Sequence, residues 1–427
     1  MKAENAAQAV RTPEATAFLE KMYGTGKAQA NAARYELVAQ GFAKTFGNRD
    51  FDFFSSPGRT EIGGNHTDHN HGKVLAGSIQ MDCVAAAAPN GTNVVNLVSE
   101  TYKQSFSIDL NNLAPTSVTA GTLPLVKGVL AAIQNKGFRL EGFDAYITSN
   151  VLGGAGVSSS ASFEMLICCI VDYLFNDHTM GVVNYAKAGQ YAENKYWLKG
   201  SGLLDQLACA VGGIITIDFV DNDNPAIRKV DCDFSDFGMD LVIVNTGKGH
   251  SDLSAEYSSV PNEMKAVAGF FGKEVLAELT EEEVIAQAPA VRNACGDRSF
   301  LRALHFFEEN KRVDAQVAAL EAGNKEDFLK KITESGNSSW KWLQNCFLTS
   351  TPSEQHITSA LALSELFLDK LGDGACRVHG GGFAGVIAVF LPKESTREFC
   401  DYINKALGSE SAYVMYIRNQ GAVKVCF

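Results

Sequence analysis

A stretch rich in glycine and serine, from Gly153 to Ser162, stands directly before an apolar run that ends at Phe175. Its glycines, among them Gly154 and Gly156, allow the backbone to turn tightly and approach a ligand, and its serines predict the start of a helix. The free N–H groups and the dipole at a helix start attract anions. Two interpretations follow, a phosphate-binding loop and a simple glycine turn with serine caps, and this stretch alone does not separate them.

Two carboxylates further along the chain are candidates for chemistry. Asp205 falls in the first turn of a predicted helix, among Leu203, Leu204 and Leu207. A carboxylate at this place commonly stabilises the helix dipole, by a few tenths to about 1 kcal/mol. The apolar neighbours favour another role, because a carboxylate with little water around it suits a general base or a group that orients a substrate. Glu193, in the preceding helical segment, is by itself only a candidate surface charge.

A polar segment, RTEIGGNHTDHNHG, begins at Arg59 after a short predicted strand and an expected turn at 55–58. Its histidines and aspartate are too polar for a buried strand and indicate a site. Three interpretations compete: a metal site of the His-x-Asp-His kind, a clamp for sugar hydroxyls that uses His66 and Asp68, and a solvated loop. The metal interpretation is weak because Gly64 stands where a metallohydrolase pattern has another histidine.

A second glycine loop, HGGGFAG, begins at His379 and leads directly into the apolar run VIAVF. A triple glycine can be a tight entry into a strand. Its combination with the glycine and serine loop of the other half of the chain favours a ligand held between two lobes.

The elements that must position these residues are predicted from periodicity. A chain of 427 residues is long for one core, so we expect two domains, 1–226 and 227–427, divided at the polar turn 221–225. Apolar spacing and turn residues predict helices at 29–46, 122–136 and 185–198 and strands at 143–149 and 212–219. Short apolar runs within 73–98, with a break at 89–91, predict antiparallel strands and a hairpin.

Composition excludes several classes of protein. The formal net charge of −12 opposes nucleic acid or an anionic membrane as a partner. The ten cysteines are scattered, without a Cys-x-x-Cys pair, which is typical of reduced thiols in a cytoplasmic protein. No signal peptide or membrane-spanning run is present in the sequence, so we expect a soluble, cytoplasmic monomer.

Taken together, the motifs resemble those of the galactokinase branch of the GHMP small-molecule kinases. PGRTEIGGNHTDHNHG from Pro57 is similar to the family's PGRVNLIGEHTDYNGG, and LGGAGVSSSA from Leu152 is similar to PxGAGLSSSA. SGLLDQ from Ser201 is similar to CGIMDQ, and RVHGGGFAG from Arg377 is similar to RMTGGGFGG. The segment from His250 to Tyr257 also matches, and the motifs keep the family's order from about Phe46 to the end of the chain.

The resemblance implies an α+β, two-lobed GHMP kinase fold. Its N-terminal lobe would be like ribosomal protein S5 domain 2, and its C-terminal lobe would be ferredoxin-like. ATP and a small-molecule sugar would lie between the lobes, with Mg²⁺ held by Ser160 and Glu193. Asp205 would face the C1 hydroxyl of galactose, with Arg59 beside it, and the enzyme would form galactose 1-phosphate.

The resemblance also assigns binding residues. The sugar would be lined by Asn65, His66, Thr67, Asp68, Gly202 and Tyr257. The ATP phosphates would meet Gly154, Ala155, Gly156, Val157, Ser158, Ser159, Ser160, Gly381 and Gly382.

Departures from the family pattern leave the acceptor open. Asn65 replaces the family's glutamate near the sugar C6 hydroxyl, and His69 replaces its tyrosine. A neutral amide removes repulsion against an anionic C6 group, so galacturonate is an alternative acceptor to galactose. A sugar-sensing regulator without catalysis is a second alternative, which the presence of Asp205, Arg59 and the serine loop disfavours. The role of His379, where the family has threonine, stays open.

Overall fold

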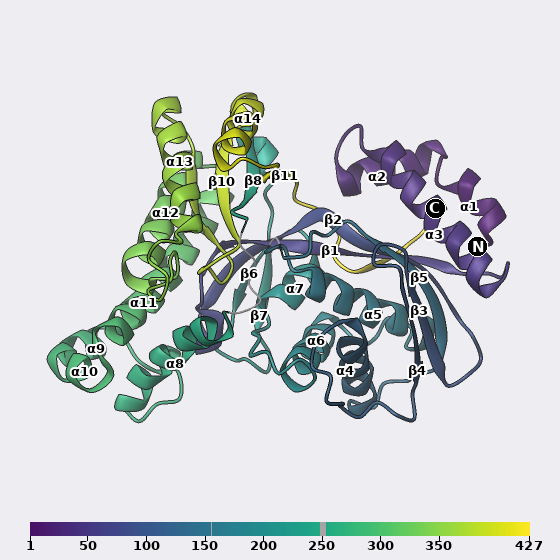
Figure 1. Ribbon diagram of the computed structural model, residues 1–427, viewed down its shortest axis with the longest axis horizontal. Coiled ribbons are helices and arrows are strands. Elements are labelled where there is room, and N and C mark those ends of the chain that lie inside the picture. Colours follow the sequence, from purple (N-terminus) through teal and green to yellow (C-terminus); the bar gives the residue numbers. More distant parts are fainter. Residues whose placement is uncertain (155, 248–252) are drawn as a thin grey trace.

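The computed structural model of the protein describes residues 1–154, 156–247 and 253–427 (Figure 1). Its helices are α1 (Ala3–Ala9), α2 (Pro13–Tyr23), α3 (Ala28–Phe46), α4 (Thr122–Asn135), α5 (Ser159–Phe175), α6 (Val182–Lys195), α7 (Leu204–Val211), α8 (Ser254–Phe270), α9 (Glu281–Ala286), α10 (Ala288–Cys295), α11 (Asp297–Glu321), α12 (Lys325–Ser338), α13 (His356–Leu371) and α14 (Thr396–Leu407). Its strands are β1 (Asp52–Gly63), β2 (Lys73–Pro89), β3 (Val94–Ser99), β4 (Gln104–Asp109), β5 (Phe143–Ser149), β6 (Ile214–Asp218), β7 (Ala226–Val230), β8 (Met239–Asn245), β9 (Ala375–His379), β10 (Val386–Pro392), β11 (Ala412–Met415) and β12 (Val423–Val425).

The strands form two sheets. The larger sheet has the order β12-β1-β2-β5-β3-β4, with β6 paired to β2 and β7 paired to β6, and the smaller has the order β11-β8-β10-β9. The last strand, β12, returns from the C-terminal half and pairs antiparallel with β1, with Val425 opposite Phe53. The domain division expected between 226 and 227 falls inside β7, so it stays a prediction.

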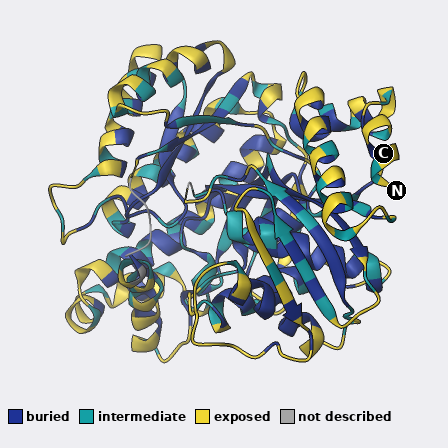
Figure 2. Cartoon of the chain, turned by 45° about the vertical axis from the view of Figure 1, so that its right-hand side comes forward, coloured by how far each residue is buried: buried dark blue, intermediate teal, exposed yellow. Residues whose placement is uncertain are grey.

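The central strands of the larger sheet, β1 and β2, are buried on both faces, whereas the outer strands β4 and β7 are largely exposed (Figure 2). Along β2, Cys83, Ala85 and Ala87 belong to the core that also holds helix α5, whereas Val84 and Ala86 belong to the core built with α1, α2 and α3. Side chains alternate between the two faces of a strand, so a strand covered on both faces is apolar at every position. The first 46 residues therefore cover the second face of this sheet.

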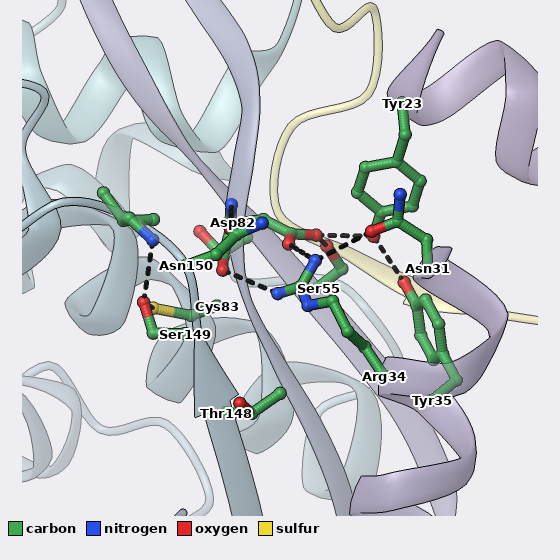
Figure 3. Close-up of polar contacts among 12 residues, drawn as sticks. Tyr23, Asn31, Arg34, Tyr35, Ser55, Asp82, Cys83, Thr148, Ser149 and Asn150 are labelled. Atoms are coloured by element: carbon green, nitrogen blue, oxygen red, sulfur yellow. Dashed lines mark hydrogen bonds and ion pairs between the residues drawn. The ribbon is translucent and has the colours of Figure 1, made fainter. Parts of the chain in front are cut away.

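A buried carboxylate, Asp82 of β2, fastens these N-terminal helices to the sheet (Figure 3). Its Oδ2 accepts hydrogen bonds from the Tyr23 hydroxyl at 2.6 Å and from Arg418 at 2.8 Å, and its Oδ1 accepts one from Arg34 at 2.8 Å. Burial would raise the pKa of Asp82, but the two arginines and the hydrogen bonds hold it below its usual range. Its backbone N–H donates to Asn150 Oδ1 at 2.8 Å, so the same network anchors the chain just before the glycine and serine loop.

Strand β1 continues through the segment 55–58, so the turn expected there is wrong. The register against β2 shifts between Pro57 and Arg59, a place where a proline without an N–H is tolerated. Gly58 is needed there because a Cβ would lie 2.6 Å from the carbonyl oxygen of Val157. The irregularity brings the N–H of Arg59 to 3.2 Å from that carbonyl, beside the glycine and serine loop.

Other predicted elements agree with the structure to different degrees. The strand at 143–149 is confirmed as β5, and the helix at 29–46 is confirmed as α3 with one further residue. The helix expected at 185–198 begins and ends three residues earlier, as α6. The strands expected within 73–98 are present as β2 and β3, with the expected break after Pro89, but the expected hairpin is wrong because β5 lies between these two strands in the sheet.

The smaller sheet also separates two apolar layers. Val242 and Val389 face α13 and α14, and Leu241 and Phe390 belong to the core shared with α12 and the larger sheet. In the described part of the chain, no helix is both long enough and apolar enough to cross a membrane.

Candidate active site

The glycine and serine loop leads from β5 into helix α5. Gly154 and Gly156 have φ angles of 72° and 66°, in the left-handed region that suits glycine. Gly156 also faces the other lobe, because a Cβ there would lie 2.5 Å from Val386 Cγ2. The first backbone bond of α5 runs from the N–H of Ser162 to the carbonyl of Ser158, so the preceding N–H groups have no acceptor within the helix. Such a helix start attracts an anion; Ala155 lies outside the described residues.

Asp205, near the start of α7, lies beside this loop. Arg59 Nε donates to its Oδ1 at 2.7 Å, and the Ser158 hydroxyl donates to its Oδ2. Ser158 has a left-handed φ of 57° and does not cap α5 with its side chain, because its hydroxyl is engaged with Asp205. A second guanidinium nitrogen of Arg59 donates to the carbonyl of Gly156. Arg59 therefore joins the carboxylate to the glycine loop.

The surroundings of Asp205 keep it ionised. Burial would raise its pKa, but the charge of Arg59 and the hydrogen bonds from Arg59 and Ser158 bring the pKa below its usual range. The Asp205 side chain is 34% exposed, whereas that of Arg59 is 8% exposed. A charged carboxylate with an open side can accept a hydrogen bond from a substrate hydroxyl.

Glu193, near the end of α6, lies on the other side of the serine loop. The Ser160 hydroxyl donates to its Oε1 at 2.9 Å, and the Ser201 hydroxyl donates to its Oε2. Lys199 Nζ lies 3.1 Å from each of the two carboxylate oxygens, and the Glu193 side chain is only 3% exposed. Glu193 is thus a buried, paired carboxylate and not a surface charge.

Ser160 and Glu193 offer adjacent oxygen atoms, which is the donor set that Mg²⁺ prefers. Among the described residues, no group of three or more His, Cys, Asp or Glu side chains is placed to hold a metal ion. A magnesium ion that is bound mainly by nucleotide phosphates and water needs only one or two protein ligands, so the pair fits such an ion.

The second glycine loop connects β9 to β10 and lies against the first. Its carbonyl groups are used within the protein: Gly380 accepts from Asn65 at 2.6 Å, Gly381 from His66 at 2.8 Å, and Gly382 from the Tyr257 hydroxyl at 3.0 Å. The loop would therefore have to meet a phosphate through N–H groups. The Tyr257 ring leaves no room for a side chain at position 381, where a Cβ would lie 2.3 Å from it.

His379 lies at the junction of the two lobes with a defined tautomer. The N–H of Glu61 donates to its Nε2 at 3.0 Å, so this nitrogen accepts and the hydroxyl of Thr60, also at 3.0 Å, donates. The proton of the neutral ring is therefore on Nδ1, which would lie 3.6 Å from a Cβ at Gly156. His379, whose role the sequence did not indicate, thus faces the first glycine loop.

Asn65 and Thr67 are fully buried. Asn65 Nδ2 donates to Glu61 Oε1 at 2.9 Å and to the carbonyl of Gly380, and its Oδ1 accepts from Asn345 at 2.8 Å. The Thr67 hydroxyl lies 2.6 Å from the carbonyl oxygen of Lys73 and 2.9 Å from that of Gly64, so its proton is used within the protein. The structure does not present these two side chains to a ligand, so their contact with a sugar stays a prediction.

Two other residues of the predicted sugar site, Asp68 and Gly202, lie close to each other near the start of α7. Asp68 approaches Gly202 so closely that a Cβ at Gly202 would lie 1.9 Å from Asp68 Oδ2. Gly202 stands three residues before Asp205, so these residues gather at the same end of α7. Burial lowers the pKa of His66 to about 3, and its Nε2 donates to the carbonyl of Gly381.

Sequence reasoning missed a cavity of about 590 Å³ beside the first glycine loop. It is lined by Tyr102, Gln104, Phe106, Thr116, Val118, Ala120, Gly121, Thr122, Leu123, Pro124, Lys127 and Tyr196. The Tyr102 hydroxyl would lie 3.7 Å from a Cβ at Gly153, so the cavity opens next to the loop. These residues come from separate segments without any common spacing, so no motif marks them.

Comparisons with known proteins find similarity over the segments that carry these residues. The galactokinase galactose-binding signature matches residues 40–89, and the N-terminal domain of GHMP kinases matches residues 124–213. The chain is 27% identical over 394 residues to a galactokinase of Clostridium tetani, covering 90% of this chain and 96% of that protein. It is 28% identical over 360 residues to a galactokinase of Actinobacillus pleuropneumoniae, and the match covers 84% of this chain and 89% of that protein.

Solved structures share the fold. The Lactococcus lactis galactokinase, crystallised with galactose, superposes with a TM-score of 0.78 at 24% identity, covering 92% of this chain and all of that one. A mevalonate kinase of Methanococcus jannaschii superposes with a TM-score of 0.57 at 18% identity, and the match covers 87% of this chain and 99% of that one. The predicted two-lobed α+β fold is confirmed by these likenesses. The chain thus has the galactose-binding signature of galactokinases and the N-terminal domain of GHMP kinases on the segments that build the site, and it is similar to galactokinases over most of their length.

Proposed function

We propose that the protein is an ATP-dependent sugar kinase that phosphorylates the C1 hydroxyl of galactose and releases galactose 1-phosphate and ADP. The observation that carries the proposal is the ionised carboxylate of Asp205, held 2.7 Å from Arg59 directly beside an anion-attracting helix start. Transfer of a phosphoryl group needs such a pairing of a group that positions the acceptor hydroxyl with donors that hold the phosphates.

Asp205 would accept a hydrogen bond from the C1 hydroxyl and take its proton as the new oxygen–phosphorus bond forms. The bond from the γ-phosphorus to the bridging oxygen breaks at the same time, and ADP leaves. Arg59 fixes one oxygen of the carboxylate and Ser158 fixes the other, so the side chain is oriented before the sugar arrives. The positive charge of Arg59 also stabilises negative charge in the transition state.

The phosphates would lie at the start of α5, where the N–H groups of the first turn have no acceptor within the helix. We assign Mg²⁺ to Ser160 and Glu193, whose oxygens lie 2.9 Å apart. When bound, this ion would neutralise phosphate charge. Gly381 and Gly382 would close the site from the C-terminal lobe through their N–H groups.

The adenosine part of ATP would occupy the cavity beside Tyr102. A volume of about 590 Å³ lies within the range of small-molecule sites, and its aromatic residues Tyr102, Phe106 and Tyr196 suit the flat face of an adenine. Its position next to Gly153 joins it to the phosphate loop.

Galactose is the acceptor that the relatives favour, since the matched proteins are galactokinases. The substitution at Asn65 gives little support to galacturonate. Its amide is fully buried and engaged by Glu61, Gly380 and Asn345, so the missing glutamate charge does not by itself create a place for an anionic group. A regulator without catalysis has no use for an ionised Asp205 oriented by Arg59, and this disfavours that alternative.

We further propose that the enzyme works as a monomer in a reducing cytoplasm. All ten cysteines are free thiols, and six of them are buried in apolar surroundings. Sedimentation of the purified protein would test the oligomeric state.

The experiment that tests the function is release of ADP from ATP with galactose, galacturonate, N-acetylgalactosamine and arabinose, against a control without sugar. We expect galactose to give the highest kcat/KM. If no sugar stimulates ADP release, the kinase proposal fails. If galacturonate exceeds galactose by about tenfold, or about 1.4 kcal/mol, the acceptor is wrong while the kinase assignment stands.

A further inference from the structure

The loop between α6 and α7 places a lysine against the carboxylate assigned to the metal. Lys199 Nζ lies 3.1 Å from each oxygen of Glu193, and the N–H of Lys199 donates to the Glu193 carbonyl at 3.0 Å. The preceding residue, Leu198, has a left-handed φ of 57°, which is unfavourable for a bulky side chain, and its side chain lies in solvent. The chain thus adopts a strained turn that sets Lys199 on Glu193.

The two partners of this ion pair differ in their freedom to move. The Glu193 side chain is 3% exposed and is also bound by Ser160 and Ser201, whereas the Lys199 side chain is 56% exposed. A lysine has three N–H donors on a flexible stem. The carboxylate is therefore fixed, and the ammonium group can leave it.

Negative charge surrounds this pair. Asp205 is ionised and raises the pKa of Lys199 together with Glu193, although burial opposes the shift. Burial and the charge of Glu193 raise the pKa of Glu164 well above its usual range. Of the two described cations that contact Glu193 and Asp205, Arg59 is 8% exposed and bound to both Asp205 and Gly156. Of these two cations, Lys199 has the more exposed side chain and can therefore move to another partner.

A divalent ion on Glu193 would repel an ammonium group that contacts the same oxygens. The new partner of the lysine would be close by, because Ser160 belongs to the phosphate loop and donates to the same carboxylate at 2.9 Å. Nucleotide phosphates at the start of α5 would therefore lie within reach of the Lys199 side chain.

We propose that Lys199 is a further phosphate-binding residue of this site, which neutralises Glu193 before the nucleotide binds and donates to the β- and γ-phosphates once Glu193 binds Mg²⁺. The inference rests on the proposed function. It adds no covalent step: the lysine stays protonated and stabilises charge on the transferring phosphoryl group. It also gives Glu193 a counter-ion in the nucleotide-free protein, where a buried charge would otherwise be costly.

The test compares Lys199→Met and Lys199→Arg with the wild type. The matched control is Lys195→Met, a change at another exposed lysine, in the last turn of α6, which contacts neither Glu193 nor Asp205 in the described structure. We expect Lys199→Met to lower kcat by about 10²-fold, as loss of one transition-state donor commonly does, with the KM for sugar unchanged. Lys199→Arg should keep part of the activity, and the control should match the wild type.

Two binding measurements separate this role from a structural one. Calorimetry with Mg²⁺ should show that Lys199→Met weakens AMP-PNP by about tenfold and leaves AMP, which lacks the β- and γ-phosphates, unchanged. Electron paramagnetic resonance with Mn²⁺ and nucleotide-free protein should show tighter Mn²⁺ binding by Lys199→Met than by the wild type.

An unchanged kcat in Lys199→Met, or an equal loss of AMP and AMP-PNP affinity, overturns the assignment to the phosphates. If Lys199→Met binds Mn²⁺ no more tightly than the wild type does, the proposal that the metal ion replaces Lys199 as the partner of Glu193 is wrong. If instead the wild type releases no ADP with any sugar, the proposed function fails, and the comparison of AMP with AMP-PNP still decides whether Lys199 meets phosphates.

Discussion

Replacing Asp205 by asparagine tests the core of the site, because it keeps the shape of the side chain and removes its charge. In the structure, Oδ1 accepts from Arg59 at 2.7 Å and Oδ2 accepts from Ser158. Asparagine can accept through one oxygen only, and its NH₂ group would face a donor. The substitution therefore removes the proton acceptor and disturbs the orientation of its neighbours at once.

The expected sizes of these two effects differ. Loss of a general base commonly lowers the rate by about 10²- to 10⁴-fold, or roughly 3 to 5.5 kcal/mol in the activation barrier. Breaking a fully buried ion pair costs about 3 to 5 kcal/mol of folding free energy, but the Asp205 side chain is 34% exposed, so we expect roughly 1 to 3 kcal/mol here. The variant should thus fold, bind both substrates and turn over very slowly.

The assay is kcat for ADP release with saturating galactose and ATP, with the free energy of unfolding measured in urea on the same sample. The matched control is Asp297→Asn, since Asp297 also lies in the first turn of a helix, α11, and pairs with an arginine, Arg292, at 2.6 Å, but is exposed. Because Asp297 is exposed, the control should lose little stability and no activity. A kcat of Asp205→Asn within about tenfold of the wild type would refute the catalytic role and leave Asp205 as a helix-dipole carboxylate.

Three further results follow from the structure. Gly202→Ala places a Cβ 1.9 Å from Asp68 Oδ2, so it should raise the KM for galactose by about tenfold or more, with the KM for ATP nearly unchanged in steady-state kinetics. Tyr102→Ala should have the opposite pattern, a higher KM for ATP alone, if the cavity holds adenine. Burial lowers the pKa of His305 to about 4, so the neutral ring stabilises the fold fully above pH 6.5 and this contribution is lost as the pH falls toward 4. In urea titrations at pH 7.5 and pH 5, the wild type should lose about 2 kcal/mol more than His305→Gln, and equal losses would contradict this assignment.

Much of the fold follows from local patterns. Strand β5 and helix α3 have clear apolar periodicity, and the sequence predicts them closely. The turn expected at 55–58 fails because Pro57 and Gly58, which are typical turn residues, here serve a register shift in a strand that is held by pairing to β2. The hairpin expected within 73–98 fails for a similar reason, because β2 pairs with β5, a distant segment, and not with β3, the next strand along the chain.

The candidate site could also be predicted only in part. Local motifs predict the glycine loops, and the family resemblance places Arg59 beside Asp205, as the structure does. The contact of Ser158 with Asp205 was not predicted, because the resemblance assigns Ser158 to the phosphates. The family resemblance implies that Ser160 lies near Glu193, as it does in the structure. The burial of Glu193 and its contact with Lys199 could not be predicted, since a lone glutamate in a helix has no local sign of burial and the contact depends on the loop after α6. The inward-facing amide of Asn65 is likewise a consequence of the C-terminal lobe, which supplies three of its partners.

The measurement that tests the central claim most directly is the identity of the product formed from galactose and ATP, followed by phosphorus nuclear magnetic resonance. The account predicts a sugar phosphate whose phosphorus is coupled to the anomeric proton, formed in step with ADP and absent with Asp205→Asn. A phosphorus signal coupled to the C6 protons, or release of inorganic phosphate without a sugar phosphate, would contradict it.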